Sequence, residues 1–321
     1  MSVDSREAAT RRLEDDLWVL DTVAQGTPGV IASYLLEGAQ GIALVDVGSA
    51  ATLERLLAAI RSAGHDLREL HTIVLTHVHL DHAGATGSLI ALAPHARVLV
   101  HPLGRPHLID PSRLIASASR IYGDRMAELW GDMLPVPADR VTEIADNEVL
   151  CIGRRTLTAL HTPGHAVHHI AYHDPQGHAL FAGDVAGVRL ESMRFVRPPT
   201  PPPDLDLEAW STSIARLSAL QLDRLYLPHF GVARMVAAHL GELEARLYAW
   251  GELIVAGMRA GKESDALAHD LAVASEPALG RTPAAQSAQV SRRYEIAANY
   301  LMSAQGYERY FRQRHPERLE P

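Results

Sequence analysis

Four potential metal ligands lie within a six-residue segment of the chain: His77, His79, Asp81 and His82. They follow the apolar run 73–75, which is typical of a short buried strand. If the chain stays extended beyond this run, side chains two residues apart point the same way, so His77, His79 and Asp81 would share one face. Imidazole and carboxylate groups are the ligands that zinc and similar ions take. The segment therefore predicts half of a metal site.

Each of these residues has an ordinary explanation when it is taken alone. A histidine at a strand end is more often a solvated or hydrogen-bonded side chain than a ligand, and Asp81 can cap the helix that begins near His82. The combination is harder to explain by packing, because polar groups cost free energy when they are buried without partners. The compact H-x-H-x-D-H pattern after a buried strand therefore favours metal binding.

Three further candidates lie where a predicted strand gives way to a loop, namely His165, Asp184 and His229. Loops at strand ends are where α/β scaffolds place their chemistry. Each also has an ordinary explanation: His165 can be a turn residue, Asp184 a loop cap and His229 a core histidine. Together with the first cluster they supply five imidazoles and two carboxylates, which is what two adjacent divalent ions need.

Composition limits both the kind of metal site and the kind of partner. The chain has 321 residues, of which 47% are hydrophobic, enough for one large domain with an appendage. Its single cysteine, Cys151, excludes an intrachain disulfide and the usual thiolate zinc sites, so any metal must be held by His, Asp and Glu. The formal charge of −8 disfavours binding to the phosphate backbone of nucleic acids.

The N-terminal residues and the hydropathy of the chain indicate a cytoplasmic protein, and the partner that we expect is a small-molecule substrate. Residues 1–16 mix acids and bases without the apolar region of a signal peptide. No run of about 18 apolar residues occurs, so no membrane span is expected. We expect neither nucleic acid nor membrane as a partner, and the sequence leaves open whether the C-terminal helices form a homodimer.

The elements that must position these residues alternate between strands and helices, which indicates a layered α/β domain. Strands are expected at 17–20, 29–36, 41–47, 73–75, 97–101, within 141–160, and at 170–173, 179–182 and 222–227. Helices are expected at 51–63, about 83–93, 110–130 and 206–220. Beyond Gly231 the pattern is helical, at 232–260, 263–275 and 285–314, with a break between the last two at the prolines of 277–283.

Two stretches between these elements invite a functional interpretation. The helical stretch 110–130 has the periodicity of an amphipathic helix that covers the core, but it also carries Arg120, Tyr122 and Trp130, so we interpret it as a substrate-facing insert. The proline-rich residues 197–203 are expected to be extended and stiff, as a connector or as the rim of an active site.

The order of the motifs H-x-H-x-D-H, T-P-G-H, F-A-G-D and P-H-F-G resembles the metallo-β-lactamase-fold hydrolases, most closely the branch that contains hydroxyacylglutathione hydrolase (glyoxalase II). The resemblance covers about residues 17–231. It implies a four-layer αβ/βα sandwich, with two mixed sheets face to face and helices outside. We therefore expect a catalytic domain at 1–231 with a helical insert at about 105–135, and a C-terminal helical region at 232–321.

The resemblance also assigns roles to the seven candidates. The first metal would be held by His77, His79 and His165, the second by Asp81, His82 and His229, and Asp184 would bridge them. The cofactors would be two divalent ions, with zinc preferred over iron or manganese. A hydroxide bridging the ions would attack a small ester, thioester or lactone, and Asp81 and Asp184 would be the catalytic carboxylates.

Departures from related patterns leave two alternatives. Dedicated β-lactamases of this fold lack the bridging aspartate, and lactonases of acyl-homoserines carry a tyrosine where this chain has Gly187. A mononuclear iron dioxygenase that acts on persulfides is similar, and would need only His77, His165 and Asp184. A phosphodiesterase is the remaining alternative.

Overall fold

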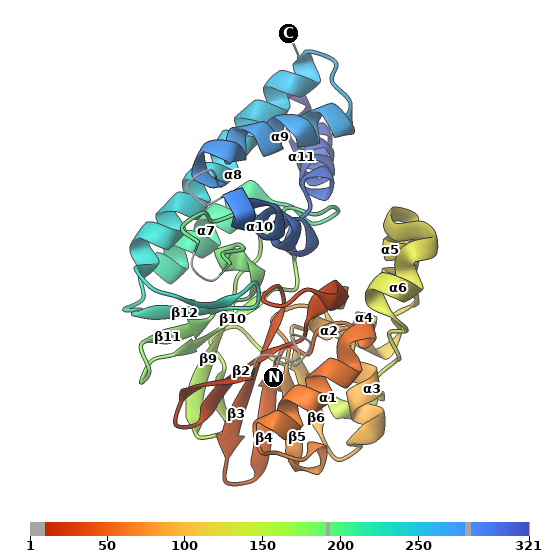
Figure 1. Cartoon of the computed structure of the whole chain (residues 1–321), viewed down its shortest axis with the longest axis vertical. Helices are drawn as coiled ribbons and strands as arrows, with labels where there is room; N and C mark the ends of the chain where they lie inside the picture. Colours follow the sequence, from red (N-terminus) through yellow and green to blue (C-terminus); the bar gives the residue numbers. More distant parts are fainter. Residues whose placement is uncertain (1–9, 191–192, 280–283, 321) are drawn as a thin grey trace.

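The fold is described by a computed structural model that covers residues 10–190, 193–279 and 284–320. Two β-sheets lie face to face in the lower part of Figure 1, and the C-terminal helices rise above them. Helices cover the outer faces of both sheets. The expected four-layer αβ/βα sandwich with a C-terminal helical region is confirmed.

The first sheet contains seven strands in chain order within the described residues. They are β1 (Arg11–Glu14), β2 (Leu17–Asp21), β3 (Ala32–Gly38), β4 (Gly41–Val45), β5 (Leu70–Val74), β6 (Arg97–Val100) and β7 (Val141–Glu143). Strands β1 to β4 are antiparallel neighbours, whereas β4 to β7 run parallel to one another. The carboxyl ends of the parallel strands therefore meet at one edge of the sheet.

The second sheet contains six strands in the order β13-β12-β11-β10-β9-β8, again within the described residues. They are β8 (Val149–Ile152), β9 (Arg155–His161), β10 (Ile170–Asp174), β11 (Ala179–Phe181), β12 (Arg224–Leu227) and β13 (Gly231–Ala233). The pairing of β13 with β12 was not expected from the sequence, and it extends the sheet to Ala233, beyond the domain boundary expected at Gly231.

Three apolar clusters separate the layers. Between the sheets, Val45, Val74 and Leu99 of the first sheet meet Tyr172 and Phe181 of the second. The outer face of the first sheet packs against α1 (Leu53–Ser62) and α3 (Thr86–Leu92). The outer face of the second sheet packs against α7 (Leu207–Ser218) and α8 (Val236–Arg259). Successive side chains of a strand point to opposite faces of the sheet, so the strands contribute apolar residues both to the cluster between the sheets and to the clusters under the helices.

The C-terminal region continues the outer layer of the second sheet. It comprises α8, α9 (Ser264–Leu279), α10 (Ala284–Ala297) and α11 (Tyr300–Arg314). The continuous helix expected at 285–314 is in fact two helices, because the side chain of Asn299 accepts a hydrogen bond from the backbone N–H of Met302 and begins α11 anew. Apolar residues of α8, α9 and α11 join one cluster with those of the second sheet.

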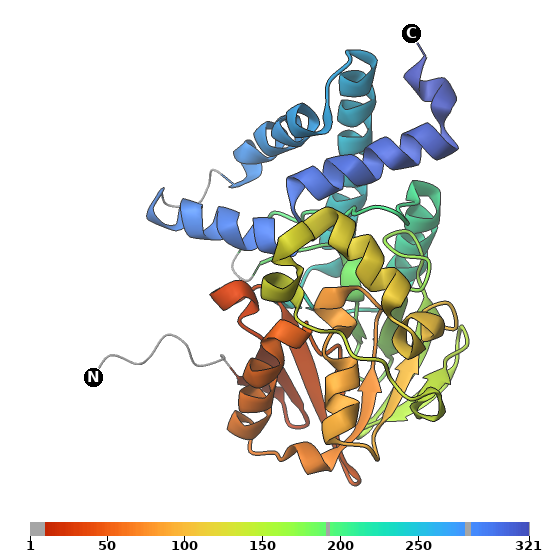
Figure 2. The ribbon, with the colours of Figure 1, turned by 90° about the vertical axis from the view of Figure 1, so that its right-hand side faces the viewer.

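The insert between β6 and β7 is also divided. It contains α4 (Arg105–Ile109), α5 (Ser112–Tyr122), the 3₁₀ turn η4 (Gly123–Arg125) and α6 (Met126–Trp130). The single helix expected at 110–130 breaks at Gly123, whose φ of 52° is accessible to glycine at little cost. Figure 2 shows the insert, in yellow, below the C-terminal helix α11.

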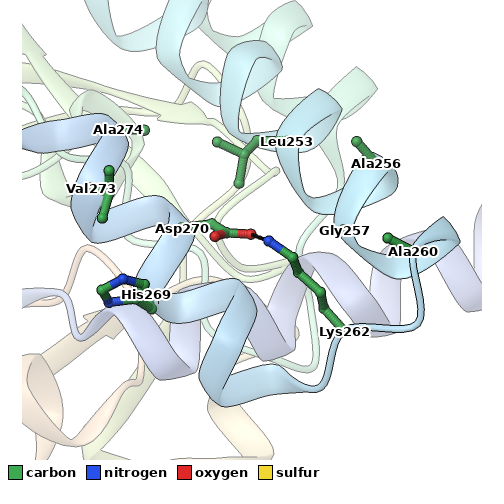
Figure 3. Close-up of a pocket in the computed structure, with 9 residues that line it drawn as sticks. All are labelled: Leu253, Ala256, Gly257, Ala260, Lys262, His269, Asp270, Val273 and Ala274. Carbon is green, nitrogen blue, oxygen red and sulfur yellow. Dashed lines mark hydrogen bonds and ion pairs between the residues drawn. The ribbon is translucent and has the colours of Figure 1, made fainter.

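A groove of about 590 Å³ lies on the C-terminal helices (Figure 3). It is lined by apolar side chains of α8 and α9, such as Leu253 and Val273, and by the ion pair of Lys262 with Asp270 at 2.6 Å. None of the seven candidate ligands lines this groove. In the described part of the chain, no helix combines the length and the apolar character that crossing a membrane requires.

Candidate metal centre

The H-x-H-x-D-H segment begins at the carboxyl end of β5, but it does not stay extended throughout. His77 and His79 lie in the irregular stretch between β5 and the short helix α2 (Leu80–Ala83), and His79, with extended backbone angles, is the last residue before this helix. Asp81 and His82 therefore lie in a helical turn, and the expectation that Asp81 shares a strand face with His77 and His79 is wrong. The turn divides the segment between two groups of ligand atoms.

The first group consists of three nitrogen atoms. Nε2 of His77 lies 3.0 Å from Nδ1 of His79 and 3.3 Å from Nε2 of His165, and the last two atoms are 3.0 Å apart. His165 comes from the loop after β9. A zinc ion about 2.0–2.1 Å from each nitrogen fits a triangle of this size.

The second group combines a carboxylate with two imidazoles. Oδ2 of Asp81 lies 3.5 Å from Nε2 of His82 and 3.4 Å from Nε2 of His229, which follows β12. The structure thus brings together side chains that are separated by almost 150 positions in the sequence, and both groups are able to hold a metal ion.

Asp184 lies between the two groups. Its loop follows β11 and contains the 3₁₀ turn η6 (Gly183–Ala186). Oδ2 of Asp184 is 3.5 Å from Nε2 of His165. Its Oδ1 is 3.5 Å from Nε2 of His82 and 3.4 Å from Nε2 of His229. One carboxylate therefore presents a different oxygen to each group.

Hydrogen bonds from the opposite ring nitrogens hold the imidazoles in these orientations. Nδ1 of His165 donates to the carbonyl of Pro199 at 2.8 Å, and Nδ1 of His229 donates to the carbonyl of Val30 at 3.0 Å. Nδ1 of His82 donates to Oδ2 of Asp46 at 2.9 Å. In each case the other nitrogen, Nε2, keeps its lone pair for the centre of the site.

Asp46 supports a candidate ligand, His82, and sequence reasoning did not single it out. Besides His82, its carboxylate accepts hydrogen bonds from the backbone N–H and the hydroxyl of Thr76, both at 2.8 Å. It adopts a φ of 54°, which is uncommon outside glycine. The only signal in the sequence was its place at the end of β4, shared by many loop residues.

His169 was also missed, although it supports Asp184. Its Nε2 accepts a hydrogen bond from the backbone N–H of Asp184 at 3.0 Å, and its Nδ1 contacts Oγ1 of Thr162 at 2.8 Å. Gly183 allows this approach, because a Cβ at that position would lie 2.3 Å from Nε2 of His169. His168, its neighbour, is buried and contacts the backbone N–H of Val78 at 3.4 Å.

The first group is uncharged. Burial lowers the pKa of His77 well below its ordinary value and lowers the pKa of His79 and of His165 to about 4, with the neighbouring imidazoles adding to the effect for each. Burial disfavours the charged form of an imidazole, since that form loses more hydration. Neutral imidazoles are the form that binds metal.

The second group attracts positive charge. Burial alone would lower the pKa of His82 and His229, but the carboxylates of Asp81 and Asp184 raise both. Burial alone would raise the pKa of Asp81, yet His82 and His229 hold it well below its usual range. A cation, whether a proton or a metal ion, is therefore stabilised between these side chains.

Three buried atoms at the centre have no hydrogen-bond partner among the described residues: Nε2 of His82, Nε2 of His229 and Oδ1 of Asp184. An unpaired buried polar atom is costly, so such atoms require an explanation. A metal ion satisfies all three at once, and His and Asp are suitable ligands for zinc. The residues present therefore fit a metal cofactor.

The three predicted substrate contacts lie on the insert. Tyr122 is half-buried, its hydroxyl donates to Sδ of Met302 at 3.1 Å, and its ring packs against Trp130 at 5.2 Å. Burial, and to a smaller extent the negative charge of Asp81, raise the pKa of Tyr122. Arg120 is exposed on α5.

Comparison with known proteins identifies the family. The profile of the metallo-beta-lactamase superfamily matches residues 26–229, more than half of the chain. A protein from Sulfurisphaera tokodaii, named metallo-beta-lactamase fold-containing protein ST1585, is 30% identical over 182 residues, which are 55% of this chain and 67% of that protein. Its solved structure superposes with a TM-score of 0.61 over 72% of this chain and 86% of its own.

Enzymes are found among the relatives, at partial coverage. A hydroxyacylglutathione hydrolase from Cupriavidus taiwanensis is 35% identical over 44% of each chain. An atrochrysone carboxyl ACP thioesterase from Aspergillus fumigatus is 29% identical over 50% of this chain and 43% of its own. The chain thus spans less than half the length of these two relatives.

A solved structure also covers the C-terminal helices. The metallo-beta-lactamase family protein TTHA1429 from Thermus thermophilus is 25% identical, with a TM-score of 0.67 over 94% of this chain and 95% of its own. Fold, ligand geometry and family profile agree, and the chain belongs to the metallo-beta-lactamase superfamily.

Proposed function

We propose that this chain is a metal-dependent hydrolase that holds two divalent metal ions and cleaves a small ester, thioester or lactone. The observation that carries the proposal is the placement of Asp184, whose two oxygens face the two ligand groups separately. His77, His79 and His165 would hold the first ion, and Asp81, His82 and His229 the second. Zinc suits this set of nitrogen and oxygen ligands, and iron or manganese are alternatives.

When bound, such ions supply a hydroxide at neutral pH and polarise the oxygen that becomes anionic. The protein's own groups orient the reactants. Asp81 is the carboxylate of the centre nearest to solvent, with 18% of its side chain exposed compared with 4% for Asp184. Its pKa lies well below its usual range, so it is ionised and suited to accept a hydrogen bond from a water molecule and to orient it.

The substrate class is proposed from the relatives, and the substrate contacts from the residues of the insert. One relative is named as a hydroxyacylglutathione hydrolase and another as an ACP thioesterase, which supports a thioester as the first substrate to test. The hydroxyl of Tyr122 on the insert donates to Sδ of Met302 on α11, so the insert and the C-terminal region are in contact. We propose that Tyr122, Trp130 and Arg120 contact the part of the substrate that is not cleaved.

Metal quantification followed by a substrate panel tests the proposal. Purified protein should contain two metal ions per chain and should hydrolyse at least one ester, thioester or lactone. A phosphodiester in the same panel tests that alternative. One iron per chain together with oxygen consumption on a persulfide would contradict hydrolysis and support the dioxygenase, which requires only His77, His165 and Asp184.

A further inference from the structure

The proline-rich strap, residues 197–203, joins the loop of Asp184 to helix α7. Its first part is buried, with Arg197 1% exposed and Thr200 0% exposed. Arg197 pairs with Val188 in an isolated antiparallel β-bridge, with both backbone hydrogen bonds at 2.8 Å, but the prolines that follow have no backbone N–H and cannot continue this pairing. Contacts with other parts of the molecule must fix the rest of the strap.

The strap reaches the metal centre through a single carbonyl group. Pro199 accepts the hydrogen bond from Nδ1 of His165 at 2.8 Å. This bond sets both the tautomer of His165 and the rotation of its ring, which decides where Nε2 points. A displacement of Pro199 would therefore move a nitrogen of the first ligand group.

Helix α11 lies against the next residue of the strap. Gly306 approaches Thr200 so closely that a Cβ at position 306 would lie 1.8 Å from the Thr200 carbonyl oxygen and 2.9 Å from its carbonyl carbon. The hydroxyl of Thr200 also donates to the carbonyl of Ser303 at 3.4 Å. Both obstructing atoms belong to the backbone, so with a larger residue at 306 the strap and helix α11 would have to move apart.

The start of the strap is held from the same side. Nη1 of Arg197 donates to Oε1 of Glu295 at 2.7 Å and to the carbonyl of Ala298 at 2.8 Å. Its guanidinium lies 3.7 Å from the ring centre of Tyr300, a cation–π contact. Residues from the end of α10 to the middle of α11 therefore contact the strap on both sides of Pro199, at Arg197 and at Thr200.

From these contacts we propose that Gly306 is a positioning residue for His165, acting through Thr200 and Pro199. Helix α11 sets the place of the Pro199 carbonyl, and this carbonyl aims Nε2 of His165 at the first metal. The inference rests on the proposed function, because it takes His165 as a metal ligand. It gives the C-terminal helical region a role in metal retention in addition to any role in substrate binding.

Two Gly→Ala substitutions, one on α11 and one on α8, separate the positioning role of Gly306 from the general effect of replacing a glycine in a helix. In Gly306→Ala the added methyl group meets the strap, whereas in Gly241→Ala on α8 it has no atom within 4 Å. Zinc affinity is measured by competition with a chromophoric chelator, and the absorption spectrum of the Co²⁺-loaded protein reports the ligand geometry. We expect Gly306→Ala to lower the affinity of one site about 10- to 100-fold and to change the spectrum. Gly241→Ala should bind as the wild type does.

His165→Ala supplies the reference, since it removes the ligand itself. If the wild type takes up no metal, or if His165→Ala keeps the wild-type affinity, the proposed function fails. If His165→Ala loses one site but Gly306→Ala binds metal as tightly as Gly241→Ala, only the positioning role of Gly306 is overturned.

A second variant covers the case in which Gly306→Ala does not fold. Arg197→Lys keeps the positive charge and adds no atoms, but lysine has neither the planar fork nor the stacking surface of arginine. We expect a loss of zinc affinity of about tenfold in a folded protein, judged by circular dichroism and the thermal midpoint. A lowered midpoint with unchanged zinc affinity would mean that the strap is only structural, and would overturn the inference.

Discussion

Asp184 is the residue that faces both ligand groups, each with a different oxygen. We expect Asp184→Ala to lower the metal content and to reduce turnover of any cleaved substrate by more than about 100-fold, since a lost ligand should cost at least as much as a lost outer contact. Metal analysis and kcat on the same preparation measure both effects.

His168→Ala is the matched control, since it removes a buried polar side chain beside the centre without removing a proposed ligand. His168 packs near His77 and His79, at ring distances of 6.2 and 5.8 Å. We expect this variant to lose less than about tenfold in turnover and to retain its metal. Equal losses from both variants would show that the ligands are assigned wrongly.

Asp46 acts on the centre through His82 and Thr76. The carboxylate of Asp46 accepts three hydrogen bonds, from the N–H and hydroxyl of Thr76 and from Nδ1 of His82. In an asparagine one of the two oxygens becomes an NH2 group, which donates and cannot accept, so at least one of these hydrogen bonds must be lost. We expect Asp46→Asn to weaken zinc binding about 10- to 100-fold, measured by chelator competition. Asp66→Asn makes the same change at an exposed aspartate that caps a 3₁₀ turn, and should bind zinc normally.

The seven candidate ligands could be picked out from the sequence because their types and spacing are distinctive, whereas the residues that support them could not. Asp46 is 30 positions from Thr76 and resembles any aspartate at a strand end. Val30 and Pro199 contribute only backbone carbonyls, which leave no mark on residue type. Such partners become visible only when the chain is folded.

At the scale of elements, we propose that the insert distinguishes between substrates. The ring of Tyr122 packs on Trp130, and its hydroxyl reaches Met302 on α11. We expect Tyr122→Ala to raise KM about tenfold while kcat changes less, because the lost contact lies away from the reacting bond. Steady-state kinetics on the best substrate of the panel measure both constants.

Tyr122→Phe isolates the ring from the hydroxyl. It keeps the packing on Trp130 and loses only the weak hydrogen bond to sulfur, so KM should stay near the wild-type value. If Tyr122→Ala changes neither constant, the insert does not contact the substrate and only covers the core.

Element types were easier to predict than element ends. The apolar periodicity of 232–260 predicted a helix, but residues 231–233 form β13, because they can pair with β12 at the edge of the second sheet. The strand β1 was not predicted at all, and it too is a sheet edge. Whether a segment at the edge of a sheet forms a strand depends on which neighbouring strand it can pair with in the folded chain, and local periodicity does not show this neighbour.

At the scale of the whole molecule, the layered class followed from alternating strands and helices, but the pairing of two sheets came only from the motif resemblance. The parallel register of β4 to β7 and the mixed order of the second sheet join residues far apart in sequence. Periodicity along one strand carries no information about which strand lies next to it.

An ion cluster ties the edge of the first sheet to the second sheet. Arg155 on β9 donates to Glu14, Asp16 and Asp174, and its side chain is 8% exposed. Glu14 also accepts from Arg224 and from the hydroxyl of Tyr226 on β12. Burying charges is favourable only when their partners are complete, so this cluster should depend on pH.

The sign of that dependence follows from Glu14. Burial alone would raise its pKa, but the hydrogen bonds from Tyr226 and Arg155 lower it below its ordinary value of 4.5. A carboxyl group whose pKa is lower in the folded state contributes stability that is fully present above pH 4.5 and is lost as the pH falls through the folded pKa. Acidification should therefore weaken the link between the sheets.

Glu14→Gln tests this link, because glutamine keeps the shape but not the charge. At pH 7 we expect a free energy of unfolding about 1 kcal/mol lower than that of the wild type, measured by urea unfolding. The difference should shrink below pH 4.5, where the wild type loses the same charge by protonation. Glu128→Gln, at a side chain that is 72% exposed, should match the wild type at every pH. A difference between Glu14→Gln and the wild type that persisted unchanged at low pH would show that the charge of Glu14 does not hold the sheets together.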